Sequence, residues 1–293
     1  MPISILPLQQ RAEQLAATLP PLLVAAERVA ATVAQGVHGR RRVGQGETFW
    51  QFRDYEPGDA PQLIDWHQSA KSDRVFVREL EWEAAQSVWI WRDISPSMAW
   101  QSSAAVPEKR ERADLLALAL AVLLVGAGEH VSLLGSGLRP ATGRNALPKL
   151  ATVMARHREA AANVPPIEPL PRHAQLVLMG DFLAPLEEID RMVRDYMERG
   201  VRGHLLQVLD PAETDLPYQG RVRFEGLEGE APWLLSRVES VRGDYHERLA
   251  AQQRGLEAIT RVAGWSYARH RTDHPPQTAL LALYAALSQS VGL

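Results

Sequence analysis

The sequence predicts an α/β fold in which a mainly parallel sheet has helices on both of its faces. From residue 87 onward, short apolar runs typical of strands alternate with longer segments typical of helices, which is the pattern of repeated βαβ units. The 293 residues include 46% apolar and 23% charged side chains, as expected for a globular protein with a large core. The most apolar segment, Leu115–Gly128, lies between Asp114 and Glu129. It is shorter than the roughly 17–25 residues that span a bilayer, so it predicts a buried helix.

Each expected strand is a short run of apolar residues, and each expected helix is a longer segment that mixes apolar and charged residues. In chain order, the strands are expected at Ser87–Arg92, His130–Gly135, Gln175–Met179 and Gly203–Leu209. The helices are expected at Glu108–Val125, Leu147–Arg158, Leu186–Arg199, Val238–Ala263 and Gln277–Ser288. The Pro-rich stretch Val164–Pro171 predicts a loop, and Arg221–Phe224 predicts an edge strand or a hairpin.

Residues 1–86 differ in character from the α/β domain that we expect at residues 87–293. Residues 9–35 have the pattern of an amphipathic helix that is interrupted by a Pro-Pro pair. Residues 36–83 are rich in Gly, Arg, Asp and aromatic side chains, and they include an extended run at Arg74–Arg78. We therefore expect an N-terminal helix, then a small strand-and-turn subdomain, and then the α/β domain.

The composition excludes several classes of function. The net charge of −3 predicts no general attraction to nucleic acid or to anionic membranes. The absence of cysteine excludes disulfides, zinc–thiolate sites, iron–sulfur clusters and thiol catalysis. Residues 1–10 lack the basic start and the long apolar stretch of a signal peptide. We therefore expect a cytoplasmic protein without membrane insertion.

The most informative stretch of the chain is the Asp-x-Ser-x-Ser loop formed by Asp93, Ser95 and Ser97, which follows an expected strand. At the carboxyl end of a buried strand, such a loop can direct one carboxylate and two hydroxyl groups to one point. These are hard oxygen ligands of the kind that magnesium or manganese takes. Ligands of an open α/β sheet gather beyond the carboxyl ends of its strands. Asp181 follows a second expected strand there, and Thr142 lies in the loop after a third, so all five residues are predicted metal ligands.

Two other interpretations of these residues stay open. Asp93, Ser95 and Ser97 also suit a set of turns that caps a short helix. Arg92 lies just inside the end of a buried strand, where it needs a partner and could compete with a cation for Asp93 or Asp181. In that case the site is vestigial and metal-free, and the protein is a scaffold.

No catalytic constellation is found in the sequence, so we expect a binding protein rather than an enzyme. A haloacid-type phosphatase needs a second Asp where this chain has Ser95, and Ser136 lacks the frame of a nucleophile elbow. The basic and aromatic segment from Arg40 to Arg78 is the best candidate for nucleic-acid binding. Because acidic residues are interleaved with it, ion pairing inside a small subdomain explains it better, and no nucleic acid is expected as a partner.

Two groups of residues carry a resemblance to a known family. The first is the signature Gly44-x-Gly46-x-x-Phe49, Arg53-x-Tyr55-x-Pro57-Gly58-Asp59, Ile64-Asp65-Trp66 and Ser69-Ala70-Lys71, completed by Val77-Arg78-Glu79 and Glu81. The second is Asp93-x-Ser95-x-Ser97-Met98, which follows the signature in the chain. Together they resemble the bacterial domain-of-unknown-function 58 family over most of the chain, from about Gly36 to the end.

The resemblance implies a Rossmann-like von Willebrand factor A domain with a metal-ion-dependent adhesion site. Carried over to this chain, the ligands are Asp93, Ser95 and Ser97, with Asp181 at the second strand end and Thr142 as a further match. Members of the family are often encoded beside MoxR-type AAA+ ATPases, which implies such an ATPase or its client as the partner. The function expected from the resemblance is a non-enzymatic protein-interaction module that uses magnesium or manganese and assists the assembly or activation of other proteins. The alternatives are the vestigial scaffold and, less favoured, a nucleic-acid-binding protein.

Overall fold

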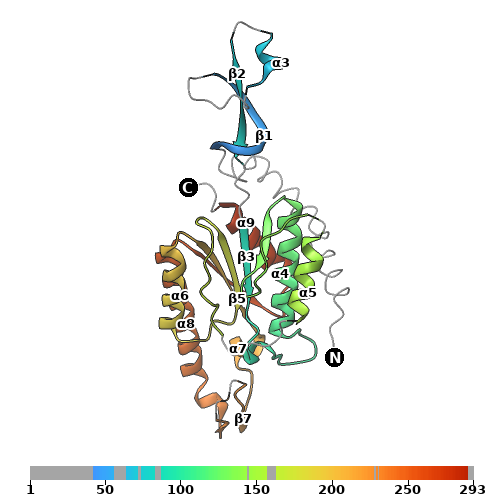
Figure 1. Ribbon diagram of the computed structural model, residues 1–293. Coiled ribbons are helices and arrows are strands. Elements are labelled where there is room, and N and C mark those ends of the chain that lie inside the picture. Colours follow the sequence, from blue (N-terminus) through green and yellow to red (C-terminus); the bar gives the residue numbers. More distant parts are fainter. Residues whose placement is uncertain are drawn as a thin grey trace.

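The computed structural model describes residues 42–55, 64–71, 74–82, 87–143, 145–156, 163–227, 229 and 231–289. At its centre is a five-stranded sheet with the order β4-β3-β5-β6-β9, in which all neighbouring strands are parallel (Figure 1). The strands are β3 (Ser87–Arg92), β4 (His130–Leu133), β5 (Gln175–Gly180), β6 (Arg202–Leu209) and β9 (Ser266–Arg271). The predicted α/β fold with a mainly parallel sheet is confirmed.

Helices cover both faces of this sheet (Figure 1). One face carries α4 (Lys109–Gly126), α5 (Ala146–Arg156) and α9 (Pro276–Gln289), and the other carries α6 (Leu186–Glu198) and α8 (Arg242–Val262). The helix expected at Val238–Ala263 is divided, because a single 3-10 turn, η3 (Val238–Ser240), precedes α8. Within the part of the chain that the structure describes, no helix is both long and apolar enough to cross a membrane.

Burial along the strands shows why their sequences lack polar alternation. β5 is buried at every position. Ile90 and Val177 belong to the core under α4, α5 and α9, whereas Trp91 and Leu178 belong to the core under α6 and α8. Successive residues of a strand point to opposite faces, so a strand that is covered on both faces needs apolar side chains throughout.

Two elements of the α/β domain, β9 and the short helix α7 (Pro211–Asp215), were not predicted. β9 forms one edge of the main sheet, and α7 follows β6. β8 (Trp233–Leu235) pairs with β7 (Val222–Phe224). Of the two alternatives for Arg221–Phe224, the structure therefore shows the hairpin. The β7–β8 hairpin lies beyond the carboxyl ends of the parallel strands, near α7 (Figure 1).

The described part of the amino-terminal segment forms a separate antiparallel hairpin with a short helix. Its elements are β1 (Arg42–Asp54), α3 (Trp66–Ser69) and β2 (Phe76–Trp82). Arg74 pairs with Asp54 at 3.2 Å, which is one example of the predicted ion pairing within this subdomain. The helix predicted at residues 9–35 lies outside the described residues.

The position of this hairpin along the chain separates it from the strand ends. β2 ends at Trp82, and β3 begins at Ser87, so the hairpin is attached at the amino ends of the parallel strands. The loops after β3 and β5 leave the sheet at the opposite end, where the parallel strands have their carboxyl ends (Figure 1). The Asp-x-Ser-x-Ser loop therefore follows the carboxyl end of β3, whereas the hairpin precedes its amino end in the chain.

Candidate functional site

The two predicted acidic loops leave the sheet side by side. β3 and β5 are neighbouring parallel strands, with Arg92 opposite Met179. Asp93 continues this pairing, because its backbone N–H donates to the Met179 carbonyl at 2.8 Å. Asp93 and Asp181 therefore follow adjacent strand ends, as the sequence predicts.

Hydrogen bonds link four of the five predicted ligands. The backbone N–H of Ser95 donates to Oδ1 of Asp93 at 2.8 Å. The hydroxyl oxygens of Ser95 and Ser97 lie 3.0 Å apart, and Ser97 Oγ donates to Oδ2 of Asp181 at 2.8 Å. Two carboxyl groups and two hydroxyl groups thus converge at the carboxyl ends of β3 and β5. We call Asp93, Ser95, Ser97 and Asp181 the strand-top cluster.

The carboxyl group of Asp93 is buried and only partly paired. Its Oδ2 atom has no hydrogen-bond partner among the described residues. Burial, and to a smaller extent the Asp181 carboxylate, raises the pKa of Asp93 to about 7, although hydrogen bonds from Ser95 and the charge of Lys109 act in the opposite direction. Burying an anionic oxygen without a partner is costly, so this carboxyl group requires either a proton or a nearby cation.

Lys109, a residue that the sequence does not single out, places a cation next to the strand-top cluster. Its Nζ donates to Oδ2 of Asp181 at 3.0 Å and to Oε1 of Glu213 at 2.5 Å. Burial alone would lower the pKa of Lys109, but the Asp181 and Glu213 carboxylates outweigh burial and raise it. Because Glu213 belongs to α7, the charged lysine ties the end of β5 to α7.

Arg92 faces away from the strand-top cluster and toward two helices. Its Nε lies 2.9 Å from Oδ1 of Asp114 in α4, and its Nη2 donates to the Met154 carbonyl in α5 at 2.6 Å. Asp114 is therefore the partner that this buried charge needs. The hypothesis that Arg92 stands in the place of a cation is wrong, because the cation that contacts Asp181 is Lys109.

Thr142 lies apart from the other predicted ligands. Its neighbour Ala141 pairs antiparallel with Val131, because the chain after β4 folds back along that strand. Val131 is in turn opposite Val88, which precedes Asp93 by five residues along β3. With about 3.3 Å per strand residue, the exposed Thr142 lies toward the other end of the sheet. The expectation that it joins Asp93 is wrong.

The strand-top cluster offers a donor set that fits a hard cation. Carboxylate and hydroxyl oxygens are ligands of magnesium and manganese, and the unpaired Oδ2 of Asp93 is an anionic ligand without a competing partner. Over the described ranges, no group of three or more His, Asp or Glu side chains is arranged to hold a metal ion. A cation at this place would therefore depend on Ser95 and Ser97 as well as on the two carboxylates.

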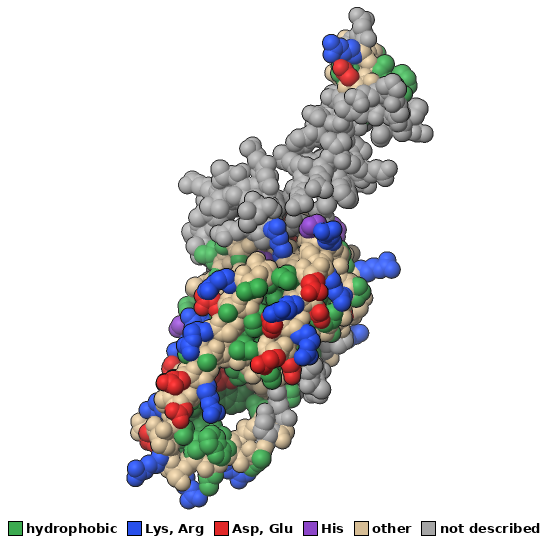
Figure 2. All heavy atoms as spheres, turned by 90° about the vertical axis from the view of Figure 1, so that its left-hand side faces the viewer, with side chains coloured by type: hydrophobic (Ala, Val, Ile, Leu, Met, Phe, Trp, Pro, Cys, Tyr) green, Lys and Arg blue, Asp and Glu red, His purple; other side chains and the backbone are tan. Residues whose placement is uncertain are grey.

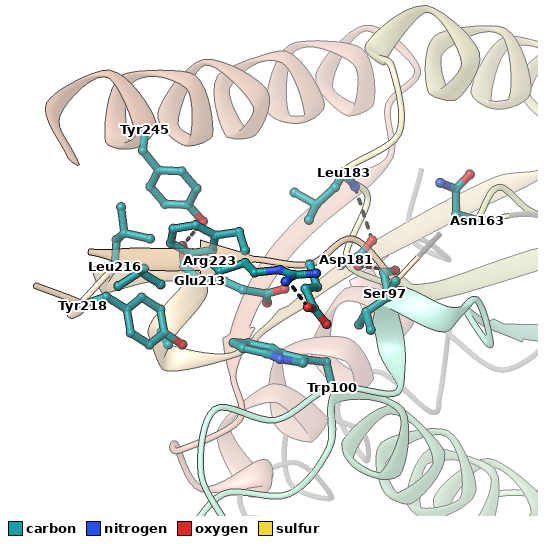
Figure 3. A pocket seen from close by; sticks show the side chains of 15 residues that line it. Ser97, Trp100, Asn163, Asp181, Leu183, Glu213, Leu216, Tyr218, Arg223 and Tyr245 are labelled. Carbon is teal, nitrogen blue, oxygen red and sulfur yellow. Dashed lines mark hydrogen bonds and ion pairs between the residues drawn. The ribbon is translucent and has the colours of Figure 1, made fainter. Parts of the chain in front are cut away.

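A cavity of about 710 Å³ lies beside the strand-top cluster (Figure 3). Ser97 and Asp181 belong to its lining, together with residues from α7, β7 and α8. Figure 3 shows these two residues on one side of the cavity and the rings of Tyr218 and Tyr245 on the other. The cluster thus adjoins a space large enough for a group from another molecule.

Replacing Gly180 with alanine is expected to disturb the strand-top cluster directly. A Cβ atom at this position would lie 2.9 Å from Cβ of Asp93 and 3.2 Å from its Oδ2. We expect Gly180→Ala to lower the free energy of unfolding by about 1–3 kcal/mol, measured by urea denaturation in a chelator. Gly126→Ala is the control, since a Cβ there meets nothing within 4 Å. Equal stability of the two variants would contradict the close approach of Asp93 to β5.

Comparison with protein families and curated proteins gives relatives without an assigned function. Residues 51–255 match the family model described as "Protein of unknown function DUF58". An uncharacterized protein of Mycobacterium tuberculosis and one of Mycobacterium bovis are each 26% identical to this chain over 277 residues. Each match covers 89% of this chain and 86% of the relative.

Two solved structures share a more distant likeness. A conserved hypothetical protein, BatB from Bacteroides thetaiotaomicron, matches with a TM-score of 0.39 and 14% identity. An aerotolerance-related membrane protein from Bacteroides fragilis matches with a TM-score of 0.38 and 15% identity. Both matches cover 70% of this chain and 99% of the other. These scores are too low to assign this chain to the fold of either protein.

Proposed function

The chain belongs to the DUF58 family, and on that premise we propose that it is a non-enzymatic protein-interaction module that binds its partner through a divalent cation. The cation is magnesium or manganese, held by the strand-top cluster. In this proposal the α/β domain is of the von Willebrand factor A type, and the cluster is its metal-ion-dependent adhesion site. Thr142 is left out of the ligand set because of its position at β4.

The observation that carries the proposal is the buried, partly unpaired carboxyl group of Asp93. Its Oδ2 atom has no hydrogen-bond partner among the described residues, although the Ser95 and Ser97 hydroxyls and Asp181 are close by. Because Asp93 is buried, water cannot stabilise its negative charge, whereas a bound divalent cation could. Asp93, Ser95, Ser97 and Asp181 would hold it.

The ligand set also determines what the cation can bind. Two hydroxyl groups bring no negative charge, and the charge of Asp181 is shared with Lys109. A cation bound here therefore keeps electrophilic character and can accept a carboxylate from outside. An Asp or Glu side chain of a partner protein is the group that fits. The resemblance described above supplies the class of partner, a cytoplasmic MoxR-type AAA+ ATPase or one of its clients, and a role in the assembly or activation of other proteins.

A second candidate function is favoured by Lys109. The ammonium group already contacts Asp181 and Glu213, so it could serve as a permanent substitute for a metal ion. The protein would then be a metal-free scaffold whose strand-top loops are held together by an internal ion pair. Under this alternative, Asp93 is protonated below its pKa of about 7, and partner binding is insensitive to chelators.

Calorimetric titration of chelator-stripped protein with magnesium and manganese chloride separates the two candidates. We expect saturable binding that is lost in Asp93→Ala and retained in Asp190→Ala, which removes a surface carboxylate of α6. Circular dichroism of both variants checks that the fold is intact. Absence of binding by the wild-type protein at millimolar metal would reject the adhesion site and favour the scaffold.

A further inference from the structure

The cavity beside the strand-top cluster has two chemically different parts. Ser97 and Asp181 mark the polar part. The apolar part contains Leu216 and the rings of Phe224 and Tyr245, and the Tyr218 and Phe224 rings pack edge to face with centroids 5.9 Å apart. In Figure 3 the two parts face each other across one continuous space. A ligand in this cavity would therefore meet the cluster and an aromatic wall at the same time.

The β7 strand of the hairpin contributes to the apolar part. β7 contributes Val222, Arg223 and Phe224 to the lining, and the chain just after it contributes Glu225 and Leu227. Figure 2 shows hydrophobic side chains gathered around a hollow at the lower end of the molecule, where Figure 1 places β7. This insertion between α7 and α8 thus adds an apolar wall to a polar strand-top site.

The rim of the cavity is apolar as well. Leu183 and Leu227 both line it and are 48% and 47% exposed. A small molecule inside the cavity would leave these two side chains in water, whereas a polypeptide that lies across the entrance would cover them. The exposed rim therefore favours a segment of a protein over a small ligand.

We propose that the cavity binds a partner segment in which an acidic residue stands next to a large apolar residue, either aromatic or leucine. This proposal rests on the proposed function, because the acidic side chain reaches the cation at the strand-top cluster. The apolar side chain enters the space between Leu216, Phe224 and Tyr245. A volume of about 710 Å³ lies in the range of about 300–1,000 Å³ that is common for binding sites, so it admits side chains but not a folded element.

The charged side chains that line the cavity agree with this placement of the partner's acidic and apolar residues. Asp181, Glu213 and Glu225 line the cavity, and Arg223 is paired with Glu225 at 3.0 Å. Lys109 contacts Asp181 and Glu213, so the three carboxylates are opposed by two cations and this group stays net negative, which is unfavourable for an acidic partner in the absence of a divalent cation. With the cation in place, the favourable position for the partner's carboxylate is the strand-top cluster, which leaves the aromatic wall for the neighbouring apolar residue.

The experiment uses a displayed library of random heptapeptides, selected on the full-length protein in magnesium chloride and, in parallel, in a chelator. We expect the sequences enriched in magnesium to combine an Asp or Glu with an adjacent Phe, Tyr, Trp or Leu. The most enriched peptide is then synthesised, and its affinity is measured by fluorescence anisotropy. Replacing its acidic residue by the amide, or its apolar residue by alanine, should each lower the affinity about tenfold or more.

Matched variants of the rim locate the binding site. Leu183→Asn with Leu227→Asn removes apolar side chains without adding charge, and we expect the peptide affinity to fall about tenfold. Val262→Asn is the control, since Val262 is 80% exposed at the other end of α8 from Tyr245. Magnesium titration of all variants should match that of the wild-type protein.

The outcomes distinguish this inference from the proposed function. If magnesium binds but no magnesium-dependent peptide is enriched, or if the rim variants bind the peptide as the wild-type protein does, the partner segment proposed here is wrong while the metal site stands. If magnesium does not bind to the wild-type protein, the proposed function fails, and this inference fails with it. Enriched peptides that lack an acidic residue would also overturn the inference.

Discussion

Replacement of Lys109 by methionine is expected to lower the free energy of unfolding of the chelated protein by about 3–5 kcal/mol. Lys109 is fully buried, and its Nζ contacts both Asp181 and Glu213. Methionine has a similar length but no charge, so Lys109→Met leaves the buried carboxylate of Asp181 and the partly buried carboxylate of Glu213 without their cation. Removal of one member of a buried ion pair costs much more than removal of a surface pair, since the remaining charge keeps its desolvation penalty. Urea denaturation at neutral pH measures the difference.

The control for this variant is a surface ion pair of similar geometry. Arg261 contacts Glu257 at 2.8 Å, with both side chains more than half exposed. We expect Arg261→Met to change the stability by less than about 1 kcal/mol. A similarly small effect of Lys109→Met would contradict the role of the lysine as the cation that holds the end of β5 to α7.

The same variant also tests how Lys109 and a divalent cation share the strand-top cluster. Two cations near Asp181 repel each other, so loss of the lysine should tighten magnesium binding. Magnesium should accordingly restore part of the stability that Lys109→Met loses. If magnesium instead binds more weakly to the variant, the lysine supports the metal site rather than competing with it.

Four of the five strands of the main sheet and the longer helices were predictable because each has a strong local signal. β3 matches its predicted bounds, and its continuous apolar run reflects burial on both faces. β9 was missed because its sequence, Ser-Tyr-Ala-Arg-His-Arg, contains no apolar run, and in this edge strand only His270 is buried. The short helix α7 does carry a readable signal, since Asp210, Pro211 and Glu213 form a capping box with proline at the start.

The candidate site was predictable where backbone topology alone decides the position. Asp93 and Asp181 converge because parallel neighbouring strands end at the same edge. Thr142 was misplaced because the chain after β4 turns back along that strand, which no residue pattern in this loop reveals. Lys109 was missed because a lysine in the charged first turn of a helix has the pattern of a surface residue. Its burial depends on Glu213, which is more than a hundred residues away in the sequence.

The pH dependence of stability gives a second large effect, which depends on Asp93. The folded protein holds a proton on Asp93 up to a pKa of about 7, whereas the ordinary value is 3.8. Between these values the unfolded chain binds fewer protons than the folded one, so the stability falls as the pH rises. We expect a loss of about 4 kcal/mol between about pH 4 and pH 7 in a chelator.

Comparison with Asp93→Asn isolates this contribution from other groups. Burial raises the pKa of Glu213 as well, so part of the decline has the same sign and remains in the variant. Lys109, whose pKa is raised from 10.5, affects only the alkaline range. The difference between the unfolding free energies of the two proteins, measured by urea denaturation at each pH, should therefore grow through the acid range and level off above about pH 7.

Magnesium should flatten the pH dependence of the wild-type stability, because a bound cation stabilises the ionised carboxylate and lowers the pKa of Asp93. If the unfolding free energies of the wild-type protein and Asp93→Asn change with pH in parallel, Asp93 ionises normally in the folded state. The electrostatic reason for a cation beside it would then be lost.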